Sequence, residues 1–424
     1  MTNPPMPDWV HDRATETPNA PALVFGGAIT TYAELNEAAD QSADELRSKG
    51  VGAGSLMRFP AVAVPETVVL IISAPRIGAT LAPFGPLQPQ GELDGAEHVY
   101  AVVTTSGSSG NPKGVILTPA NIVAAVAASQ ARLSNDASDR WLLCLPLFHI
   151  AGLSAVWRSL AAGGSVLIHD RFDAMAVAGA LKGGDASVVS LVPTMLHRVL
   201  DADPGPYTGL KAVLLGGGPA GRSLVERALD AGLPVLPTYG TTETASQVAT
   251  VAPGEEHEAF GTVGRPLDGM TVSFDDGEIM VEGPAVSPGY LGERLRTGPH
   301  RTHDLGYLDD NGRLVVTGRK DHIILTGGEK VVPQFVEAVL ASFPSIRRAV
   351  VVGVPDNDWG EAVVAVVEND ALDEPALAAR ARAALAAHQV PKRWVRVDAL
   401  PELPNGKVDR AAVASMLGRE SEDG

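Results

Sequence analysis

Residues Thr104 to Val115 read TTSGSSGNPKGV, a loop rich in glycine and hydroxyl side chains that ends in a lysine. The loop follows the apolar run AVV, which predicts a strand. It is not a Walker A loop, because counted from Gly107 the places for the second glycine, the lysine and the Ser/Thr hold Pro112, Lys113 and Gly114. The ordinary P-loop interpretation therefore fails.

The chemistry of this loop still favours an anion. Its glycines let backbone N–H groups approach a ligand closely, its hydroxyls are donors, and its lysine is a mobile cation. A solvated turn after the strand is the alternative, because Gly/Ser loops are common connectors. The residues that we expect to contact phosphate are Thr104, Thr105, Ser106, Gly107, Ser108, Ser109, Gly110 and Lys113.

Composition excludes several classes of function. The chain has 424 residues, enough for two or three domains, and a formal charge of −17 argues against non-specific binding to nucleic acid or anionic membranes. No apolar run approaches a spanning helix and the N-terminus has no signal pattern, so we expect a cytoplasmic protein without membrane insertion. The single cysteine, Cys144, lies in an apolar run and is expected in the core rather than as a nucleophile.

Hydrophobic patterning predicts the organisation. From about residue 34 to 240, short Val- and Leu-rich runs alternate with alanine-rich helical stretches, the βα pattern of a mostly parallel, buried sheet. From about 262 the pattern changes to strands and turns, which predicts a small β-rich subdomain. A compact α+β unit follows, with helices at about 333–342 and 375–388 and strands at RRAVVVGV and EAVVAVVE.

Four further segments carry chemistry. LLGGGPA (214–220) places three glycines after a predicted strand, and TYGTTETAS (238–246) combines an aromatic ring, hydroxyls and a carboxylate. Asp304 and Arg319 lie fifteen residues apart across a predicted hairpin, and Lys407 sits in PNGKVDR, a predicted turn. In this order the segments resemble the adenylate-forming superfamily of acyl-CoA synthetases, amino-acid adenylation domains and luciferases, over nearly the whole chain.

The resemblance implies a fold and a reaction. It implies an α/β protein with a large N-terminal domain of mixed sheets, flanking helices and a small β-rich subdomain at 1–318, a hinge at 319–321 that pivots at Asp321, and a small, mobile α+β domain at 322–424. It also implies that a carboxylate attacks the α-phosphate of ATP, which gives an acyl-adenylate and then a thioester with CoA. The implied partners are thus a small carboxylic acid, ATP, Mg²⁺ and CoA, and a homodimer stays open.

The roles of the superfamily's residues carry over by motif. Lys407 resembles the catalytic lysine, which neutralises charge between the attacking carboxylate and the α-phosphate. Glu243 resembles the carboxylate that holds Mg²⁺, a hard cation suited to one carboxylate plus phosphate oxygens. The other residues implied in ATP binding are Gly216, Gly217, Gly218 and Pro219 near the purine, Tyr239 stacked on adenine, Gly240, Thr241, Thr242 at the α-phosphate, and Asp304 and Arg319 at the ribose. The GGEK turn implies CoA contacts at Gly327, Gly328 and Glu329.

Other residues bear on the identity of the acid. Amino-acid-activating relatives place an aspartate where LPLFHIAG has His149, so an amino acid is disfavoured, and His149 is implied beside the acyl pocket as a catalytic or packed core residue. LPLFHIAGLSAVWRSL, SLVPTML and LLGGGPA most resemble the o-succinylbenzoate–CoA ligases of menaquinone biosynthesis, whose substrate is a dianion. Candidates near its carboxylates are Arg158, Ser190, Thr194, Gly240 and Ser246.

Alternatives remain open at this point. Ser190 and Thr194 could instead cap the following helix, and Arg158 could form a surface or interdomain ion pair. The enzyme could be a CoA ligase for another aryl or medium-chain acid, or a stand-alone adenylation protein that loads a carrier protein.

Overall fold

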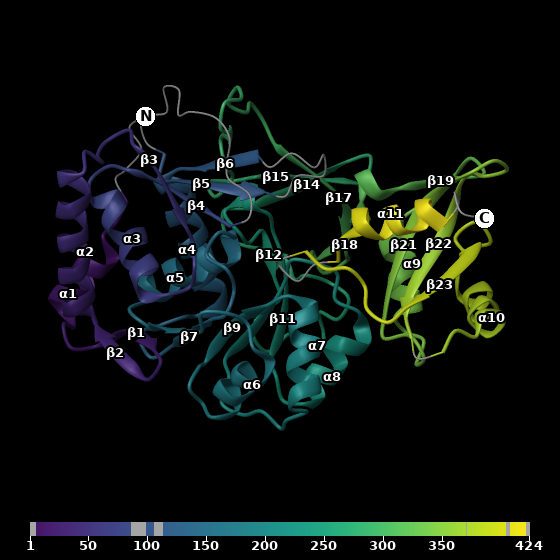
Figure 1. Ribbon diagram of the computed structural model, residues 1–424, viewed down its shortest axis with the longest axis horizontal. Helices are drawn as coiled ribbons and strands as arrows, with labels where there is room; N and C mark the ends of the chain where they lie inside the picture. Colours follow the sequence, from purple (N-terminus) through teal and green to yellow (C-terminus); the bar gives the residue numbers. More distant parts are fainter. Residues whose placement is uncertain (1–5, 86–98, 106–112, 370, 404–407, 421–424) are drawn as a thin grey trace.

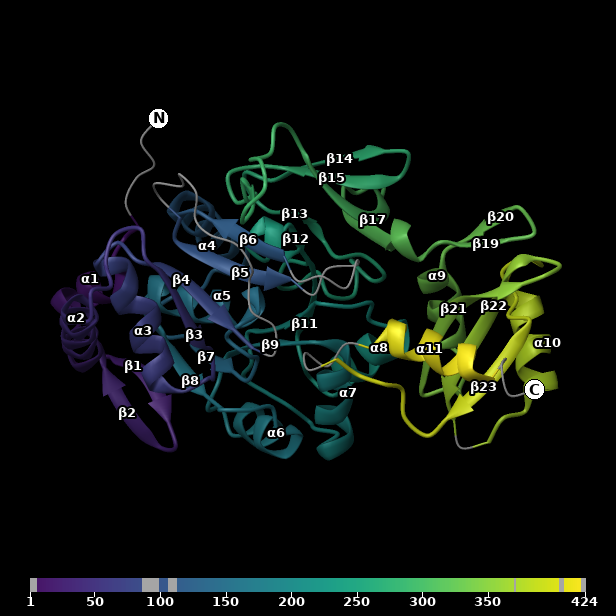
Figure 2. The ribbon, with the colours of Figure 1, turned by 45° about the horizontal axis from the view of Figure 1, so that its top comes forward.

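A computed structural model describes residues 6–85, 99–105, 113–369, 371–403 and 408–420. The chain forms a large N-terminal part with three sheets, purple to green in Figure 1, and a smaller C-terminal part with one sheet at the other end of the long axis. In both ribbon views the segment after the last strand returns towards the N-terminal part, beside α7 (Figures 1 and 2). The α/β fold with a large and a small unit is as predicted.

The first sheet has nine strands and is parallel in its centre, as the βα pattern predicts. Both edges are antiparallel, because β2 turns back on β1 and because β12 and β13 return against β11. In spatial order the strands are β13 (Arg265–Pro266), β12 (Ala249–Thr250), β11 (Val235–Tyr239), β10 (Ala212–Leu215), β9 (Val188–Leu191), β7 (Arg140–Leu143), β8 (Ser165–Ile168), β1 (Pro21–Phe25) and β2 (Ala28–Thr31).

A second sheet of five strands carries the glycine-rich segment. Its order is β16 (Gly289–Tyr290), β6 (Lys113–Leu117), β5 (Ala101–Thr105), β4 (Thr80–Phe84) and β3 (Leu56–Pro60). β3, β4 and β5 are parallel, whereas β5 and β6 are antiparallel, so that the two ends of the 106–112 segment lie on neighbouring strands.

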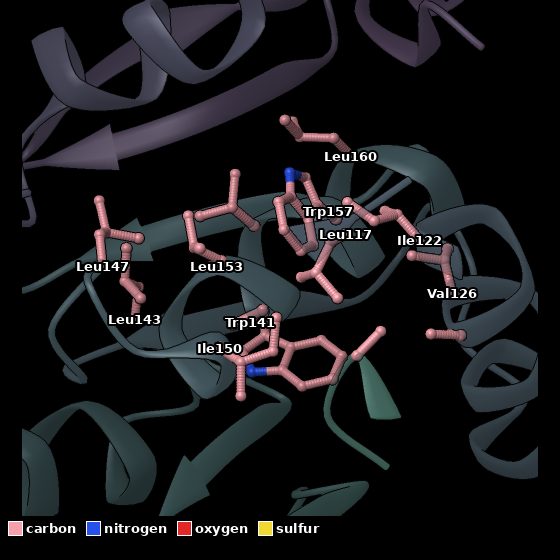
Figure 3. Packing of buried hydrophobic residues seen from close by; sticks show 14 of the residues in the cluster. Leu117, Ile122, Val126, Trp141, Leu143, Leu147, Ile150, Leu153, Trp157 and Leu160 are labelled. Carbon is pink, nitrogen blue, oxygen red and sulfur yellow. The ribbon is translucent and has the colours of Figure 1, made fainter. Parts of the chain in front are cut away.

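The described N-terminal part has eight α-helices. Seven of them surround the sheets, whereas α5 packs between the first and the second sheet. Leu117 on β6, Ile122 on α4, Trp141 on β7 and Trp157 on α5 all contribute to one buried cluster (Figure 3). α5 is apolar on nearly all sides, which is expected of a helix buried between two sheets. The helices are α1 (Trp9–Glu16), α2 (Tyr32–Ser48), α3 (Pro65–Arg76), α4 (Pro119–Leu133), α5 (Ile150–Ala162), α6 (Ala174–Lys182), α7 (Pro193–Ala202) and α8 (Arg222–Asp230).

The predicted β-rich subdomain is a four-stranded antiparallel sheet, which Figure 2 shows at the top of the molecule. Its strands are β14 (Thr271–Asp275), β15 (Glu278–Glu282), β17 (His300–Leu308) and β18 (Leu314–Arg319). The hairpin of β17 and β18 sets Asp304 directly opposite Arg319. A short 3₁₀ helix, η2 (Lys320–His322), follows β18 and leads into the C-terminal part.

The C-terminal part is α+β, with elements close to the predicted ones. Its first described elements are β19 (Ile324–Thr326), β20 (Glu329–Val331) and α9 (Pro333–Leu340), followed by β21 (Arg348–Asp356), β22 (Gly360–Glu368), α10 (Glu374–Ala384), β23 (Arg393–Val397) and α11 (Arg410–Glu420). The long antiparallel pair β21–β22 is buried between two apolar clusters. No helix in the described ranges is long and apolar enough to cross a membrane.

Candidate active site

The ends of the predicted phosphate loop are held by β5 and β6. Thr104 pairs with Gly114 and Thr105 with Lys113, and the Oγ1 atom of Thr104 is buried without a hydrogen-bond partner among the described residues. The five residues Ser106, Gly107, Ser108, Ser109 and Gly110 lie outside the described residues. Lys113 Nζ lies 2.9 Å from Glu293 Oε1 and 4.7 Å from the centre of the Tyr290 ring.

Tyr290 connects Glu243 with this lysine, because it contacts both side chains. It sits in the 3₁₀ turn η1 (Thr242–Thr244), and the Tyr290 hydroxyl donates a 2.9 Å hydrogen bond to Glu243 Oε1. Burial and the Glu243 carboxylate raise the pKa of Tyr290, so its hydroxyl remains a donor. Among the described residues no cluster of three or more His, Cys, Asp or Glu side chains could hold a metal. A single carboxylate fits Mg²⁺, which commonly takes one or two protein carboxylates and completes its shell with phosphate and water oxygens.

The turn before Glu243 requires glycine. A Cβ on Gly240 would lie 1.5 Å from the carbonyl oxygen of Ser246, so no larger residue fits. Ala245 and Ser246 both have positive φ, which folds the chain back sharply behind η1. The Oγ1 atom of Thr241 is buried and has no hydrogen-bond partner within the described ranges, and is therefore available to a ligand. The backbone thus holds Thr241, Thr242 and Glu243 in one compact group.

Tyr239 and Asp304 meet at the end of β11. The Tyr239 hydroxyl donates to Asp304 Oδ2 at 2.7 Å, and Arg319 Nη1 donates to Asp304 Oδ1 at 2.9 Å. Burial and the nearby Asp304 carboxylate raise the pKa of Tyr239 well above its ordinary value. Arg319 also reaches Asp321 Oδ2 at 3.2 Å. The three residues predicted at adenine and ribose are therefore in direct contact, next to the predicted hinge.

The glycine turn after β10 lies beside α7. A Cβ on Gly216 would lie 2.8 Å from Thr238 Cγ2, and Gly217 has a φ of +80°, a conformation that glycine adopts readily. The Cβ position of Gly218 is 4.0 Å from Pro193, the first residue of α7, and Pro219 follows directly. The turn predicted near the purine therefore abuts the helix that also reaches the cavity described next.

A cavity of about 540 Å³ opens at the carboxyl ends of strands from both large sheets. Its walls come from the segments that follow β3, β4, β7 and β8, together with α7 and residues 402 and 403 of the C-terminal part. Ligands of open α/β folds bind at the carboxyl ends of strands, so this cavity is the candidate site for the acid. Its wall is largely apolar, with Phe84, Phe148 and Met195 among the lining residues.

Two arginines and two carboxylates add charge to this cavity. Arg171 and Arg198 are exposed and line it, together with Asp170 and Glu402. Cys144 also lines the cavity but is buried, and burial raises the pKa of its thiol to about 12. Cys144 is thus a packing residue, as expected from the sequence.

The predicted acid-site residues are only partly brought together here. His149 is the N-cap residue of α5, and its ring lies 4.4 Å from that of Phe148, which lines the cavity. Ser190 lies on β9 and Thr194 on the first turn of α7, but neither is the N-cap of α7, because that residue is Val192, without a side-chain cap. Ser190, Thr194 and Ser246 do not line the described cavity.

Arg158 is placed differently from either expectation. It lies nine residues after His149 on α5, about 13 Å along the helix axis at 1.5 Å per residue. It is buried, with its guanidinium 5.8 Å from the Trp141 ring, and no ion pair to it is found in the described residues. Burial lowers its pKa to about 9. It neither lines the cavity nor forms a surface ion pair, so it is a core residue.

The GGEK turn connects β19 and β20. Gly327 and Gly328 both have positive φ, as in two-residue hairpin turns of type I′, and Glu329 begins β20. Gly327 packs against Trp359, whose side chain is 43% exposed and carries Lys392 Nζ 4.2 Å above its ring. The predicted CoA turn therefore has an exposed aromatic face and a cation beside it.

Two patterns of known protein families together match most of the chain. The pattern of the AMP-binding enzyme family matches residues 10–96 and 94–291, and that of the AMP-binding enzyme C-terminal domain matches residues 336–407. The chain belongs to the AMP-binding enzyme family. The family resemblance drawn from the motifs is thereby confirmed.

Individual family members are similar over almost their full length. A 2-succinylbenzoate–CoA ligase of Geobacillus kaustophilus is 35% identical, with 98% of this chain and 97% of that protein covered. The o-succinylbenzoate CoA synthetase of Bacillus subtilis, solved with the acyl-adenylate intermediate OSB-AMP, superposes with a TM-score of 0.87 at 29% identity, covering 96% of this chain and 98% of that one. Its complex with ATP and magnesium gives 0.85 at 28% identity, with 95% and 98% covered.

The structure also adds residues that the motifs missed. Tyr290 and Arg296 belong to a segment with no motif of its own, and Arg296 is half-buried with its Nη1 atom lacking a partner in the part of the chain that is described. Arg171, Arg198 and Glu402 were also missed. The sequence signal for Arg198 is the helical phase of SLVPTMLHR, since Met195 and Arg198 are three residues apart and share a helix face.

Proposed function

We propose that this enzyme is an AMP-forming acid–thiol ligase that converts o-succinylbenzoate to o-succinylbenzoyl-CoA. In the first step an oxygen of the aliphatic carboxylate attacks the α-phosphorus of ATP, and the bond to pyrophosphate breaks. In the second step the sulfur of CoA attacks the acyl carbon, and AMP leaves. The relatives named for this reaction cover nearly the whole chain.

The composition of the cavity is the observation that supports o-succinylbenzoate as the substrate. Its largely apolar wall suits an aromatic ring, while Arg171 and Arg198 offer cations to a second carboxylate. Arginine suits this task, because its planar guanidinium can bind a carboxylate through two parallel hydrogen bonds. Arg198 therefore replaces Arg158 as our candidate for the ring carboxylate of the substrate.

The first step uses groups from four parts of the chain. Thr104, Lys113 and the 106–110 segment would hold the β- and γ-phosphates, Tyr239, Asp304 and Arg319 the nucleoside, and Thr241 and Thr242 the α-phosphate. Glu243 would hold Mg²⁺, which neutralises phosphate charge. Lys407 lies outside the described residues and remains our proposed catalytic lysine, since Val408, the residue after it, is paired with Glu402 at the cavity.

The second step requires the C-terminal part to turn. We propose residues 319–321 as the hinge between an N-terminal domain, 1–318, and a C-terminal domain, 322–424. Rotation would bring the turn of Gly327, Gly328 and Glu329 to the adenylate, with Trp359 beside it for CoA. We expect the reaction to take place in the cytoplasm.

The test is pyrophosphate release across a panel of acids, with and without CoA. o-Succinylbenzoate should turn over best, and CoA should convert the adenylate to a thioester. Benzoylpropionate lacks the ring carboxylate, so it should lose about 10- to 200-fold in kcat/KM, which corresponds to one charge-assisted hydrogen bond of about 1.5–3 kcal/mol. If a fatty acid or another aryl acid turns over better, the substrate is wrong. Adenylation without transfer to CoA would favour a carrier-protein thiol instead.

Arg198→Met refines the same test. It should reduce the discrimination between o-succinylbenzoate and benzoylpropionate, because only the first acid offers a carboxylate to the lost guanidinium. Arg158→Met makes the same substitution at an arginine of the core that does not line the cavity. It should leave the ratio of the two kcat/KM values unchanged. A ratio unaffected by loss of Arg198 would exclude this residue as the carboxylate partner.

A further inference from the structure

Glu402 forms an ion pair between the two parts of the chain. Its Oε2 atom lies 2.7 Å from Nη2 of Arg198 on α7, although the two residues are 204 positions apart in the sequence. Both residues line the cavity assigned to the acid. The pair is therefore a polar contact between the C-terminal part and the wall of the acid site.

The other oxygen of the same carboxylate is held inside the C-terminal part. Glu402 Oε1 accepts a 2.7 Å hydrogen bond from Nη1 of Arg348, the first residue of β21. Arg348 also lies 3.4 Å from Glu368, whose carboxylate accepts a hydrogen bond from the backbone N–H of Leu400. Arg348 thus fixes the direction of Glu402, and the free oxygen is presented to Arg198.

The position of Glu402 in the chain indicates which segment its ion pair with Arg198 holds. Glu402 forms an antiparallel bridge with Val408, and Lys407 precedes Val408 in the chain. The contact with Arg198 consequently anchors the base of the segment that carries Lys407 to the acid-binding part. When the C-terminal domain turns away, α7 stays with the N-terminal domain, and the pair must break.

We propose that Glu402 is a positioning residue for the adenylation step: its ion pair with Arg198 docks the base of the Lys407 segment at the acid cavity. This inference rests on the proposed function, because it assumes two half-reactions with different domain orientations. The guanidinium of Arg198 has five N–H donors, so it can bind the substrate carboxylate and Glu402 together.

The test separates the two half-reactions. Glu402→Gln should slow single-turnover adenylation of o-succinylbenzoate about two- to five-fold, the range expected for one partly exposed ion pair. Thioester formation from supplied acyl-adenylate should stay the same or become faster. Glu402→Arg, which places like charges beside Arg198 and Arg348, should slow adenylation further without slowing the second step.

Two controls distinguish docking from general stability. Asp201→Asn removes a 2.7 Å ion pair with Arg227 that also involves α7 but stays within the N-terminal part, so it should change neither step. In a double-mutant cycle, Glu402→Gln should have little further effect on adenylation once Arg198 is methionine. Equal losses in both half-reactions, or additive losses in the cycle, would overturn the role of Glu402. Failure of the wild-type enzyme to adenylate o-succinylbenzoate would instead overturn the proposed substrate.

Discussion

Replacing Tyr290 by phenylalanine tests how Glu243, the proposed magnesium ligand, is held. The change removes the hydroxyl that donates to Glu243 Oε1 at 2.9 Å. It keeps the ring, and with it the contact to Lys113 Nζ 4.7 Å from the ring centre. Tyr290→Phe therefore separates the hydrogen bond to the carboxylate from the ring contact with Lys113 of the predicted phosphate loop.

The size of the effect follows from the geometry. Hydrogen bonds to charged groups contribute about 1.5–3 kcal/mol, and loss of a group that orients a metal ligand typically costs about 10- to 100-fold in metal affinity. Tyr290 is only half-buried, and water can replace part of the lost bond. We therefore expect the apparent affinity for Mg·ATP in adenylation to fall about 10-fold, the lower end of that range.

The assay is pyrophosphate release from o-succinylbenzoate, with Mg²⁺ and ATP varied together. Tyr307→Phe is the matched control, because that tyrosine lies on β17 and is 53% exposed. Tyr290→Leu should lose more, since the ring over Lys113 is then removed as well. An unchanged Mg·ATP dependence in Tyr290→Phe, or an equal change in Tyr307→Phe, would refute the assignment of Glu243 as the orientated metal ligand.

Three further predictions concern other groups. Lys407→Ala should slow adenylation by a factor on the order of 10² or more while thioester formation from supplied adenylate survives, and equal losses would contradict its role. Asp321→Pro fixes φ near −65°, so adenylation should persist while transfer to CoA fails, and two normal steps would exclude a pivot there. Burial and Arg296 lower the pKa of His300 to about 4 from 6.5, so the unfolded chain binds the extra proton between these values. The unfolding free energy should consequently fall by up to about 3 kcal/mol on acidification through that window. Urea unfolding of His300→Gln should show a flatter pH dependence than the wild type. An equal pH dependence in both proteins would contradict the assignment to His300.

Local sequence signals predicted most of the fold. The predicted strand EAVVAVVE lies within β22, and the pairing of Asp304 with Arg319 follows from two strands joined by a short turn. The antiparallel edges of the first sheet were not predicted, because β12 and β13 are only two residues long and carry no periodicity. Short strands depend on their neighbours for their conformation, so propensity alone does not reveal them.

The proposed acid site was harder to predict than the proposed nucleotide site. The residues proposed to bind the nucleotide lie in motifs whose local turns hold them in place, as at Gly240. The cavity instead joins strand ends from two sheets to residues 402 and 403, so no single segment reveals it. Arg158 shows the same limit, because the sequence does not indicate that α5 is buried between sheets and that its arginine faces the Trp141 ring.

The hairpin of β17 and β18 places two tasks on one side chain. Arg319 binds Asp304 through one nitrogen and Asp321, two residues further along, through another. On the proposed assignment, one guanidinium therefore contacts both the residue that binds the nucleoside and the residue about which the domains rotate. The affinity for the nucleotide and the rate of domain rotation are therefore coupled. Substitutions of this arginine would change both. Selection for faster release of AMP would also change how readily the enzyme reopens for the next ATP.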